Sequence, residues 1–498
     1  MLAWLWIEYA RPSSVAAAAA ILVSCSPFLP AQASAATVNY GLTTEKNVQL
    51  LPPIPTTFEP LPELTLPVFT RVVLPNGMRV LLLQDREVPL VRGELLMRGG
   101  QYASPADKIG IATLSASVQR AGGSIAHPAP AVNERLEQLA ASIEAGAGPQ
   151  AVSVGFQCLV PDFPEVLGLF SEIVRTPQLD NKELQFFKAQ VKNSISHQYD
   201  SSGAVSRRQL QQLVYGKDSL YARQPTEAQV EALRLSDVAD FISEWERPDT
   251  AVLGMVGDFE LQPMLEQLTA AFGDWAPAEG QPATARIIVP PFDLPPQSGA
   301  GRVYLVDRPG STQASVAMAE PGVSLTDPAM FPLEVLGSVF NSFGGQLFDQ
   351  IRSRQGLAYS VSGGWDSPID HQGLFVAGGD PTSCAPAQEE LDTAKAETLN
   401  SFVFNFSSLP AQMQRILSYE LLDLPQDYLF RYIDGIKDVS TAGVLEAATQ
   451  HLHPELQTTV ITADAKAVRE SLVAAGFDPI DLELPNIRTG GMRMTISG

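Results

Sequence analysis

Residues 343–364 read FGGQLFDQIRSRQGLAYSVSGG, and the interpretation of the whole chain starts from this stretch. Its apolar side chains Leu347, Phe348 and Ile351 repeat at helical spacing. Gly356 predicts the end of that helix. The next six residues, LAYSVS, alternate between apolar and polar side chains, which is typical of a strand. The stretch therefore predicts a helix, a tight turn and a strand.

Two polar side chains of this stretch are candidates for a binding site. Arg352 falls in the last turn of the predicted helix, and Tyr359 follows seven residues later. A guanidinium and a phenol that converge across one turn can bind a peptide carbonyl or a carboxylate. A purely structural interpretation is also open, in which Arg352 caps the helix C-terminus and Tyr359 packs at a sheet edge.

The stretch belongs to the second of two internal repeats. RGELLMRGGQYASPADKIGIATLSASVQRAGG, residues 92–123, aligns without gaps with ASVAMAEPGVSLTDPAMFPLEVLGSVFNSFGG, residues 314–345. The apolar run, the loop with proline, the helical pattern and the terminal Gly-Gly coincide. Further on, FKAQVKNSI matches AKAETLNSF. Repetition at this scale predicts two copies of one fold.

The offset between the copies changes along the chain. Gly123 corresponds to Gly345, 222 positions later, whereas Asn193 corresponds to Asn400, 207 positions later. About fifteen residues are therefore missing from the second copy, in the region that precedes Asn400. We expect the second copy to lack a counterpart of the helix predicted at 163–175.

The first copy predicts an α+β sandwich with helices on one face of a sheet. Asn76 and Gly77 separate two apolar runs, a strong hairpin signal. We expect strands at 90–97, 151–159 and 250–259, and helices at 109–120, 132–145, 163–175, 182–198, 236–245 and 261–272.

The sequence divides into six segments at changes in composition. They are an export signal at 1–35, an extended Pro-rich arm at 36–69, a first domain at 70–275, a Pro-rich linker at 276–301, a second domain at 302–485 that is one helix short, and a tail at 486–498.

The N-terminal segment predicts export to the periplasm or the cell exterior. An apolar run at 15–23 precedes Ala33, Ser34 and Ala35, which form a signal-cleavage pattern. The alternative is a lipid-anchored envelope protein, because the residues that end at Cys25 resemble a lipoprotein box. Only in that case would the protein be held at a membrane.

Composition excludes some classes of partner. The chain has 498 residues, 45% hydrophobic and 18% charged, which is typical of a globular protein with two or more domains. A net charge of −22 argues against binding to nucleic acid or to an anionic membrane. It favours solubility and would attract basic peptides.

The cysteines form no metal pattern. Without the export signal, Cys158 and Cys384 remain, far apart in the sequence. Cys158 lies in the apolar run VSVGFQCLV and is interpreted as a small core residue. A disulfide between the two thiols stays open as an alternative in an oxidising compartment.

LFDQIRSRQGLAYSV resembles the C-terminal signature of peptidase family M16, the zinc peptidases related to pitrilysin, insulinase and mitochondrial processing peptidase. The resemblance implies two tandem α/β sandwich domains of the LuxS/MPP-like metallohydrolase fold, which form one half of a clamshell. It also implies that Arg352 and Tyr359 face a zinc site from the opposite domain, where they bind substrate and help to hold the reacting carbonyl.

The zinc motif of that family is degenerate in this chain. The resemblance places His-x-x-Glu-His on the first copy's helix, where the sequence has Thr113, Ala116 and Ser117. Hydroxyl groups are poor zinc ligands beside imidazole, and alanine cannot move a proton. The third ligand position falls at Asn193 or Ser194. We therefore expect no catalytic residue in this motif and no metal bound by this chain.

The histidines do not replace the missing ligands. His197 lies on the same predicted helix as the third ligand position, and one imidazole does not hold a catalytic zinc. His451 and His453 are expected at a helix end before a proline, where histidine favours the helix dipole. The sequence also has no G-x-S-x-G, no P-loop and no complete Rossmann fingerprint.

Three hypotheses follow. The first is a non-catalytic subunit of a heterodimeric M16-type zinc peptidase, inactive alone, in which the partner subunit carries the zinc and this chain contributes Arg352 and Tyr359 to peptide binding. The second is a proteolytically inactive binding or structural protein, resembling the core subunits of respiratory complexes that share the fold. The third is a self-sufficient hydrolase that uses other residues.

Overall fold

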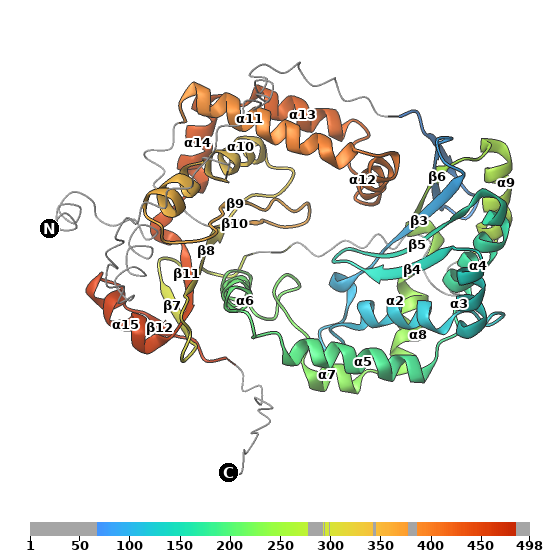
Figure 1. Ribbon diagram of the computed structural model, residues 1–498, viewed down its shortest axis with the longest axis horizontal. Helices are drawn as coiled ribbons and strands as arrows, with labels where there is room; N and C mark the ends of the chain where they lie inside the picture. The colour runs from blue at the N-terminus through green and yellow to red at the C-terminus, as the bar shows by residue number, and fades with distance from the viewer. Residues whose placement is uncertain are drawn as a thin grey trace, which may run out of the picture.

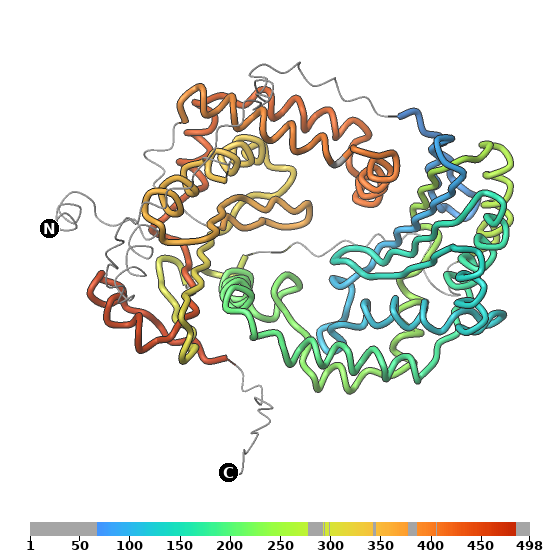
Figure 2. The backbone as a smooth tube through the Cα atoms, in the orientation of Figure 1, coloured from blue at the N-terminus to red at the C-terminus, as the bar shows by residue number. Residues whose placement is uncertain are grey.

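The computed structural model describes residues 67–276, 292, 294–297, 299–341, 345–376 and 386–484. It is a mixed α/β structure with two six-stranded sheets, which confirms the predicted fold class. Figure 2 shows the blue and green residues of the first half on one side and the yellow to red residues of the second half on the other. The export signal, Cys25, Cys384 and most of the predicted arm, linker and tail lie outside the described residues.

The first sheet has the strand order β1-β2-β6-β3-β5-β4. Its strands are β1 (Thr70–Val73), β2 (Arg79–Gln84), β3 (Leu90–Arg98), β4 (Ser142–Ala147), β5 (Ala151–Leu159) and β6 (Ala251–Gly257). Only β2 and β6 run parallel. The predicted hairpin at Asn76 and Gly77 is confirmed: β1 and β2 pair antiparallel around it, and Gly77 has φ 88°.

Helices cover the first sheet on the side away from the second half (Figure 1). The helices of this half are α2 (Ile111–Gly122), α3 (Ala129–Gln138), α4 (Phe163–Arg175), α5 (Asn181–Ser196), α6 (Ser202–Tyr215), α7 (Glu227–Ala232), α8 (Leu235–Trp245) and α9 (Leu261–Phe272). In α4 the buried residues Val166, Phe170 and Ile173 recur every three or four positions and pack into the main core.

The helix predicted at 132–145 is wrong in its second half. Helix α3 ends at Gln138, Ala140 has φ 47°, and Ser142–Ala147 form the edge strand β4. Alanine and glutamate in this segment favour a helix. Pairing with β5 along the whole of β4 satisfies the backbone instead, so a long-range contact overrides the local preference.

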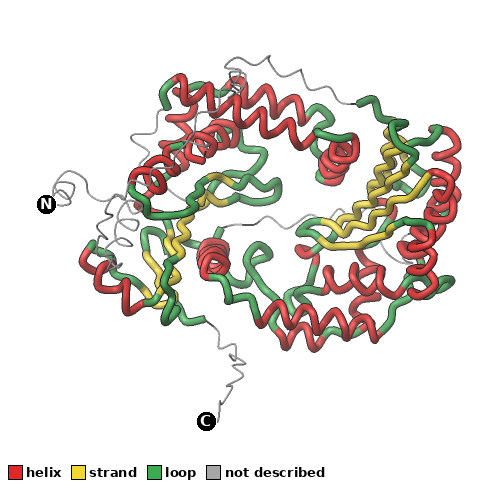
Figure 3. Tube along the Cα trace, viewed as in Figure 1, coloured by secondary structure: helices red, strands yellow, loops and turns green. Residues whose placement is uncertain are grey.

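The second sheet repeats the first, with the order β12-β7-β11-β8-β10-β9. Its strands are β7 (Val303–Asp307), β8 (Ser315–Pro321), β9 (Gly364–Trp365), β10 (Leu374–Val376), β11 (Thr458–Ala463) and β12 (Ile480–Asp481). Its helices are α10 (Met330–Asn341), α11 (Gln388–Val403), α12 (Leu409–Leu421), α13 (Tyr428–Asp438), α14 (Thr441–His451) and α15 (Ala465–Ala474). Figure 3 shows the two sheets in separate halves of the molecule.

Strand pairing reproduces the offsets between the repeats. Met97 pairs with Ala251 in the first sheet, and Ala319 pairs with Thr458 in the second. Met97 and its counterpart Ala319 are 222 positions apart, and Ala251 and its counterpart Thr458 are 207 positions apart, as in the sequence alignment. Eleven residues connect β10 to α11, whereas twenty-one connect β5 to α5 and include the 13-residue helix α4. The shorter connection, part of which lies outside the described residues at 377–385, has no room for a helix of that length.

The two halves exchange one helix each. Helix α12 packs on β3 and β6 of the first sheet, where Met413, Ile416 and Leu417 join Leu81 and Val252 in one buried cluster. Helix α6 packs in the same way on β8 and β11 of the second sheet. Figure 1 shows each of these helices beside the sheet of the other half. Each sheet therefore depends on the opposite half for the cover of one face.

Three arginines of the first sheet hold the C-terminal end of α12. Arg79 donates to the carbonyl of Glu420 at 2.7 Å, and Arg98 donates to the carbonyl of Leu421 at 2.9 Å. Arg71 pairs with the Glu420 carboxylate. Cations at a helix C-terminus satisfy its free carbonyls and its dipole, so this contact fixes the exchanged helix.

Cys158 is a free thiol in the core. It lies on β5 and is 1% exposed, which confirms its interpretation as a small core residue. Burial raises the pKa of the Cys158 thiol to about 12, so it stays protonated and unreactive.

Candidate functional site

Arg352 and Tyr359 lie together at the surface of the second half. Arg352 is in the π-helix η4 (Phe348–Arg354), and Tyr359 follows in a segment without regular structure. The guanidinium carbon of Arg352 lies 5.2 Å from the centroid of the Tyr359 ring and 4.6 Å from that of Phe348. The cation thus lies within cation–π distance of two aromatic rings.

The strand predicted for LAYSVS is wrong. Residues 357–363 are in no strand, and the chain enters the second sheet only at β9, Gly364–Trp365. Within the described residues β9 pairs with β10, and the residues that would face 357–363 if this pairing continued, 377–383, lie outside them. Alternation of apolar and polar side chains is thus not sufficient to predict a strand at these positions.

The Arg352 guanidinium has no carboxylate partner within the described residues. The nearby Asp349 carboxylate forms its ion pair with Arg354, at 2.8 Å. Tyr359 is 88% exposed and does not pack at a sheet edge. An unpaired cation beside an exposed phenol leaves hydrogen-bond donors directed at solvent. These groups can bind a carbonyl oxygen or a carboxylate.

Helix α2 places the degenerate motif in the first half. Ala116 is fully buried, Thr113 is exposed, and the Ser117 hydroxyl donates to the Thr113 carbonyl at 2.9 Å. That hydroxyl serves its own helix. Neither the ligands nor the base of a zinc peptidase is present at these three positions, so the donor set does not fit a catalytic zinc.

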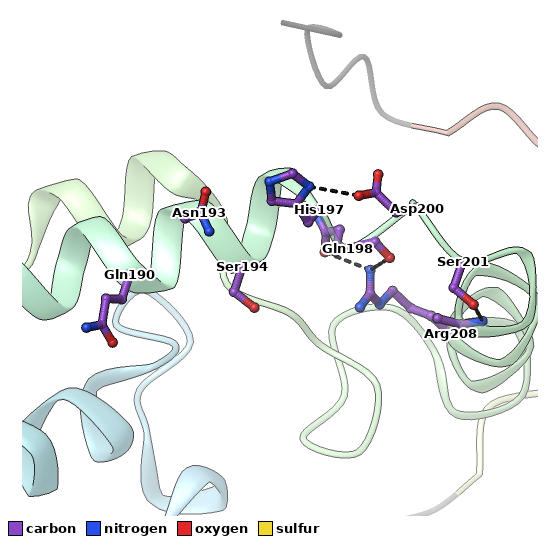
Figure 4. Close-up of a pocket in the computed structure, with 9 residues that line it drawn as sticks. Gln190, Asn193, Ser194, His197, Gln198, Asp200, Ser201 and Arg208 are labelled. Carbon is purple, nitrogen blue, oxygen red and sulfur yellow. Dashed lines mark hydrogen bonds and ion pairs between the residues drawn. The ribbon is translucent and has the colours of Figure 1, made fainter.

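A pocket of about 700 Å³ lies where α5 turns into α6 (Figure 4). It is lined by Gln190, Asn193, Ser194, His197, Gln198, Asp200, Ser201, Ala204 and Arg208. Asn193 and Ser194, the predicted third ligand position, are therefore in this pocket, whereas the α2 residues are not among its lining. Polar residues at 190, 193, 194 and 197 share one helix face, and this spacing could have revealed the pocket from the sequence.

The His197 ring contacts the carboxylate of Asp200, three residues later in the chain. Its Nδ1 lies 2.7 Å from Oδ2 of Asp200, and both side chains are exposed. Arg208 donates to the side-chain oxygen of Gln198 at 2.8 Å, as Figure 4 shows. No group of three or more His, Cys, Asp or Glu side chains that could hold a metal occurs in the described part of the chain.

The other histidine pair also has structural partners. His451 lies in the last turn of α14, which confirms the predicted helix end. The backbone N–H of His453 donates to the buried Glu320 carboxylate at 2.9 Å, and its ring lies 3.5 Å from the same group. No local pattern predicts this pairing, because Glu320 is more than 130 positions away.

The buried carboxyl group of Glu246 is hydrogen-bonded to helix α2. The side chain of Gln119 donates to Oε2 of Glu246 at 2.6 Å, and both residues are buried. Burial raises the pKa of Glu246 to about 8, although the bond from Gln119 lowers it. Among the described residues, neither Oε1 of Gln119 nor Oε1 of Glu246 has a hydrogen-bond partner. A protonated Glu246 can donate to the Gln119 oxygen and satisfy both atoms.

Comparison with known proteins connects this geometry to one family. The family described as Peptidase M16 inactive domain matches residues 232–402. An uncharacterized zinc protease of Streptomyces coelicolor is 30% identical over 160 residues, which cover 32% of this chain and 33% of that protein. The matched region thus spans a third of that relative. A non-peptidase homolog of Helicobacter pylori, YmxG, is 20% identical over 77% of this chain and 91% of its own length.

Solved structures share the fold. A peptidase M16 inactive domain from Pseudomonas fluorescens has a TM-score of 0.68 at 21% identity, with 80% of this chain and 98% of that chain covered. The periplasmic protease PqqL from Escherichia coli has a TM-score of 0.63 at 15% identity, with 82% of this chain and 49% of that chain covered. Residues 232–402 are therefore similar to the M16 inactive domain, and the chain shares the fold of solved M16 proteins. Its helix α2 has Thr113, Ala116 and Ser117 at the positions compared with the zinc motif.

Proposed function

We propose that this chain is the non-catalytic subunit of a two-chain M16-type zinc peptidase, inactive alone. The observation that carries the proposal is the Arg352 guanidinium, which has no carboxylate partner in the described part of the chain and lies 5.2 Å from the exposed Tyr359 ring. The chain also lacks the zinc motif. Loss of the metal ligands with retention of this pair is what a division of labour between two chains predicts.

In the proposed complex the partner subunit holds the zinc and this chain holds the substrate. A peptide would add as a strand to a sheet edge of the partner. Arg352 and Tyr359 would donate to the scissile carbonyl as negative charge develops on its oxygen. The zinc-bound water of the partner would supply the nucleophile.

The test begins with purification of the chain from its native host together with whatever binds it. We expect a second M16 chain with an intact zinc motif. Cleavage of a peptide library by the pair should fall by about a hundredfold to a thousandfold in Arg352→Ala, because oxyanion donors contribute at that level. Tyr359→Phe, which removes only the hydroxyl, should fall less.

Arg354→Ala is the matched control, since Arg354 is a neighbouring exposed arginine that already pairs with Asp349. It should leave cleavage unchanged. Equal rates for wild type, Arg352→Ala and Tyr359→Phe would refute the shared site.

The second candidate is a proteolytically inactive binding or structural protein. The observation in its favour is the description of the Helicobacter relative as a non-peptidase homolog. A complex that contains no zinc-bearing subunit and cleaves no peptide would establish this alternative. Zinc-dependent cleavage by this chain alone would instead support a self-sufficient hydrolase.

We also propose that the chain is exported, to the periplasm or beyond. The described residues contain no helix long and apolar enough to cross a membrane, and one structural neighbour is a periplasmic protease. A mature N-terminus near Ala36 would support cleavage and release. A lipid on Cys25 would show that the protein is anchored in the envelope.

A further inference from the structure

A cluster of aromatic and polar side chains joins the two halves at the β9–β10 hairpin. The Tyr221 ring stacks on the His371 ring with centroids 3.5 Å apart and planes at 19°. The Tyr221 hydroxyl donates to Oδ2 of Asp370 at 3.3 Å, and the Tyr215 hydroxyl donates to the carbonyl of Gln372 at 3.0 Å. Tyr215 and Tyr221 come from the first half and the hairpin residues from the second.

This contact buries ionisable groups in a turn. The side chains of Asp370 and His371 are 11% and 6% exposed, and Nδ1 of His371 lies 3.0 Å from Oδ1 of Asp370. Burial raises the pKa of the Asp370 carboxyl, but hydrogen bonding and the charge of His371 lower it further, so the carboxylate form is favoured. Turns usually expose such residues. Their burial therefore indicates one defined arrangement of the hairpin.

The first half holds Tyr221 from the other side. Tyr102, in η1 (Gln101–Ala103), packs edge-on against Tyr221 with centroids 5.1 Å apart. Gln229 donates to the carbonyl of Ala106 at 3.1 Å, which ties the start of α7 to the same loop of the first half. The chain after α6 is thus fixed to the connection between β3 and α2.

The hairpin in turn determines where the Tyr359 segment ends. Strand β9 begins at Gly364, five residues after Tyr359. Trp365 packs on Phe375 with ring centroids 4.2 Å apart, and the N–H of Gly363 donates to Oδ1 of Asn341 at 2.7 Å. Among the described residues, the C-terminal part of 357–363 is held by Asn341, by the packing of Val361 on the buried cluster of the second half, and by this hairpin.

We propose that the stacked pair Tyr221–His371 positions the Arg352–Tyr359 pair relative to the first half of the molecule. Tyr221 and His371 are positioning residues that act through the hairpin. One consequence of this inference rests on the proposed function: peptide binding by Arg352 and Tyr359 would depend on a contact between the two halves. The positioning itself is a property of this chain alone.

Hydrogen exchange of the full-length chain tests it. The peptide that covers 363–366 includes the Gly363 amide and the Asp366 amide, which donates to the carbonyl of Leu374 at 2.9 Å. In Tyr221→Leu this peptide should exchange between about twofold and about tenfold faster, the range expected for the loss of one aromatic pair. Peptides from α2 should keep their protection, which shows that the fold persists.

Two further variants make the result specific. Tyr221→Phe keeps the stacking and loses only a 3.3 Å hydrogen bond, so exchange at 363–366 should return close to the wild-type rate. Tyr419→Leu removes another aromatic pair, Tyr419 with Tyr428 at 5.2 Å, without touching the hairpin, and should leave 363–366 unchanged. Unchanged exchange at 363–366 in Tyr221→Leu would overturn the inference.

The outcome is separable from that of the proposed function, because the exchange measurement uses neither partner nor peptide. Faster exchange in Tyr221→Leu supports the positioning role even if Arg352→Ala leaves peptide cleavage unchanged. Unchanged exchange overturns the positioning role even if the shared site is real.

Discussion

At the scale of single residues, the candidate site could be predicted in identity but not in conformation. The sequence named Arg352 and Tyr359 and expected them to converge, and the structure brings the guanidinium to 5.2 Å from the ring. The sequence did not show that the Phe348 ring also lies near Arg352, at 4.6 Å, or that the residues around Tyr359 form no strand. Those features depend on which partners the sheet offers, and no local pattern encodes them.

Glu246 gives a prediction at the same scale. Its pKa rises from 4.5 in the unfolded chain to about 8 in the buried native site, so the native state binds the extra proton between those pH values. Because the unfolded state then binds fewer protons, the free energy of unfolding contributed by this group falls as pH rises from about 4.5 to about 8. The slope is at most about 1.4 kcal/mol per pH unit.

Urea denaturation at pH 5 and at pH 8 measures this slope. Glu246→Gln replaces the acid by an amide that can still exchange two hydrogen bonds with Gln119, so the variant should lose less stability between the two pH values than the wild type. The prediction fails if both proteins show the same change.

At the scale of elements, periodic helices and alternating strands were predictable where local pattern and tertiary context agree. Helices α4 and α9 have the predicted bounds, and β5 buries alternate side chains as its pattern indicates. Strand β4 was missed because its alanines and glutamate favour a helix until β5 pairs with them. The sequence did not predict that α6 and α12 pack on the sheet of the opposite half. Both are ordinary amphipathic helices, and the strands that they contact are far away in the sequence.

The exchanged helix α12 can be tested by one substitution. Leu417 is fully buried between α12 and the first sheet. Leu417→Ala should reduce the free energy of unfolding by about 2 to 5 kcal/mol, because it removes buried methyl groups and leaves a cavity. Leu445→Ala on α14, where the residue is 39% exposed, is the control and should cost much less. Equal denaturation midpoints for Leu417→Ala and wild type would show that α12 does not hold the first sheet.

At the scale of the whole molecule, the two repeats carry different candidate functional groups. Two copies of one fold contact each other through α6 and α12, and the two copies differ in their polar side chains at the candidate site positions. The first copy has Thr113, Ala116 and Ser117 where the family has its zinc motif, and the second copy presents Arg352 and Tyr359. The molecule has the fold of the M16 inactive domain structures and has no group at these three positions that could activate water.

The most direct test of this claim is the zinc content of the purified full-length chain, measured by mass spectrometry of the metal after equilibration with zinc and removal of excess. The account predicts no stoichiometric zinc on this chain alone and about one zinc per complex after the partner subunit is added. One tightly bound zinc on this chain alone, together with zinc-dependent peptide cleavage, would contradict it.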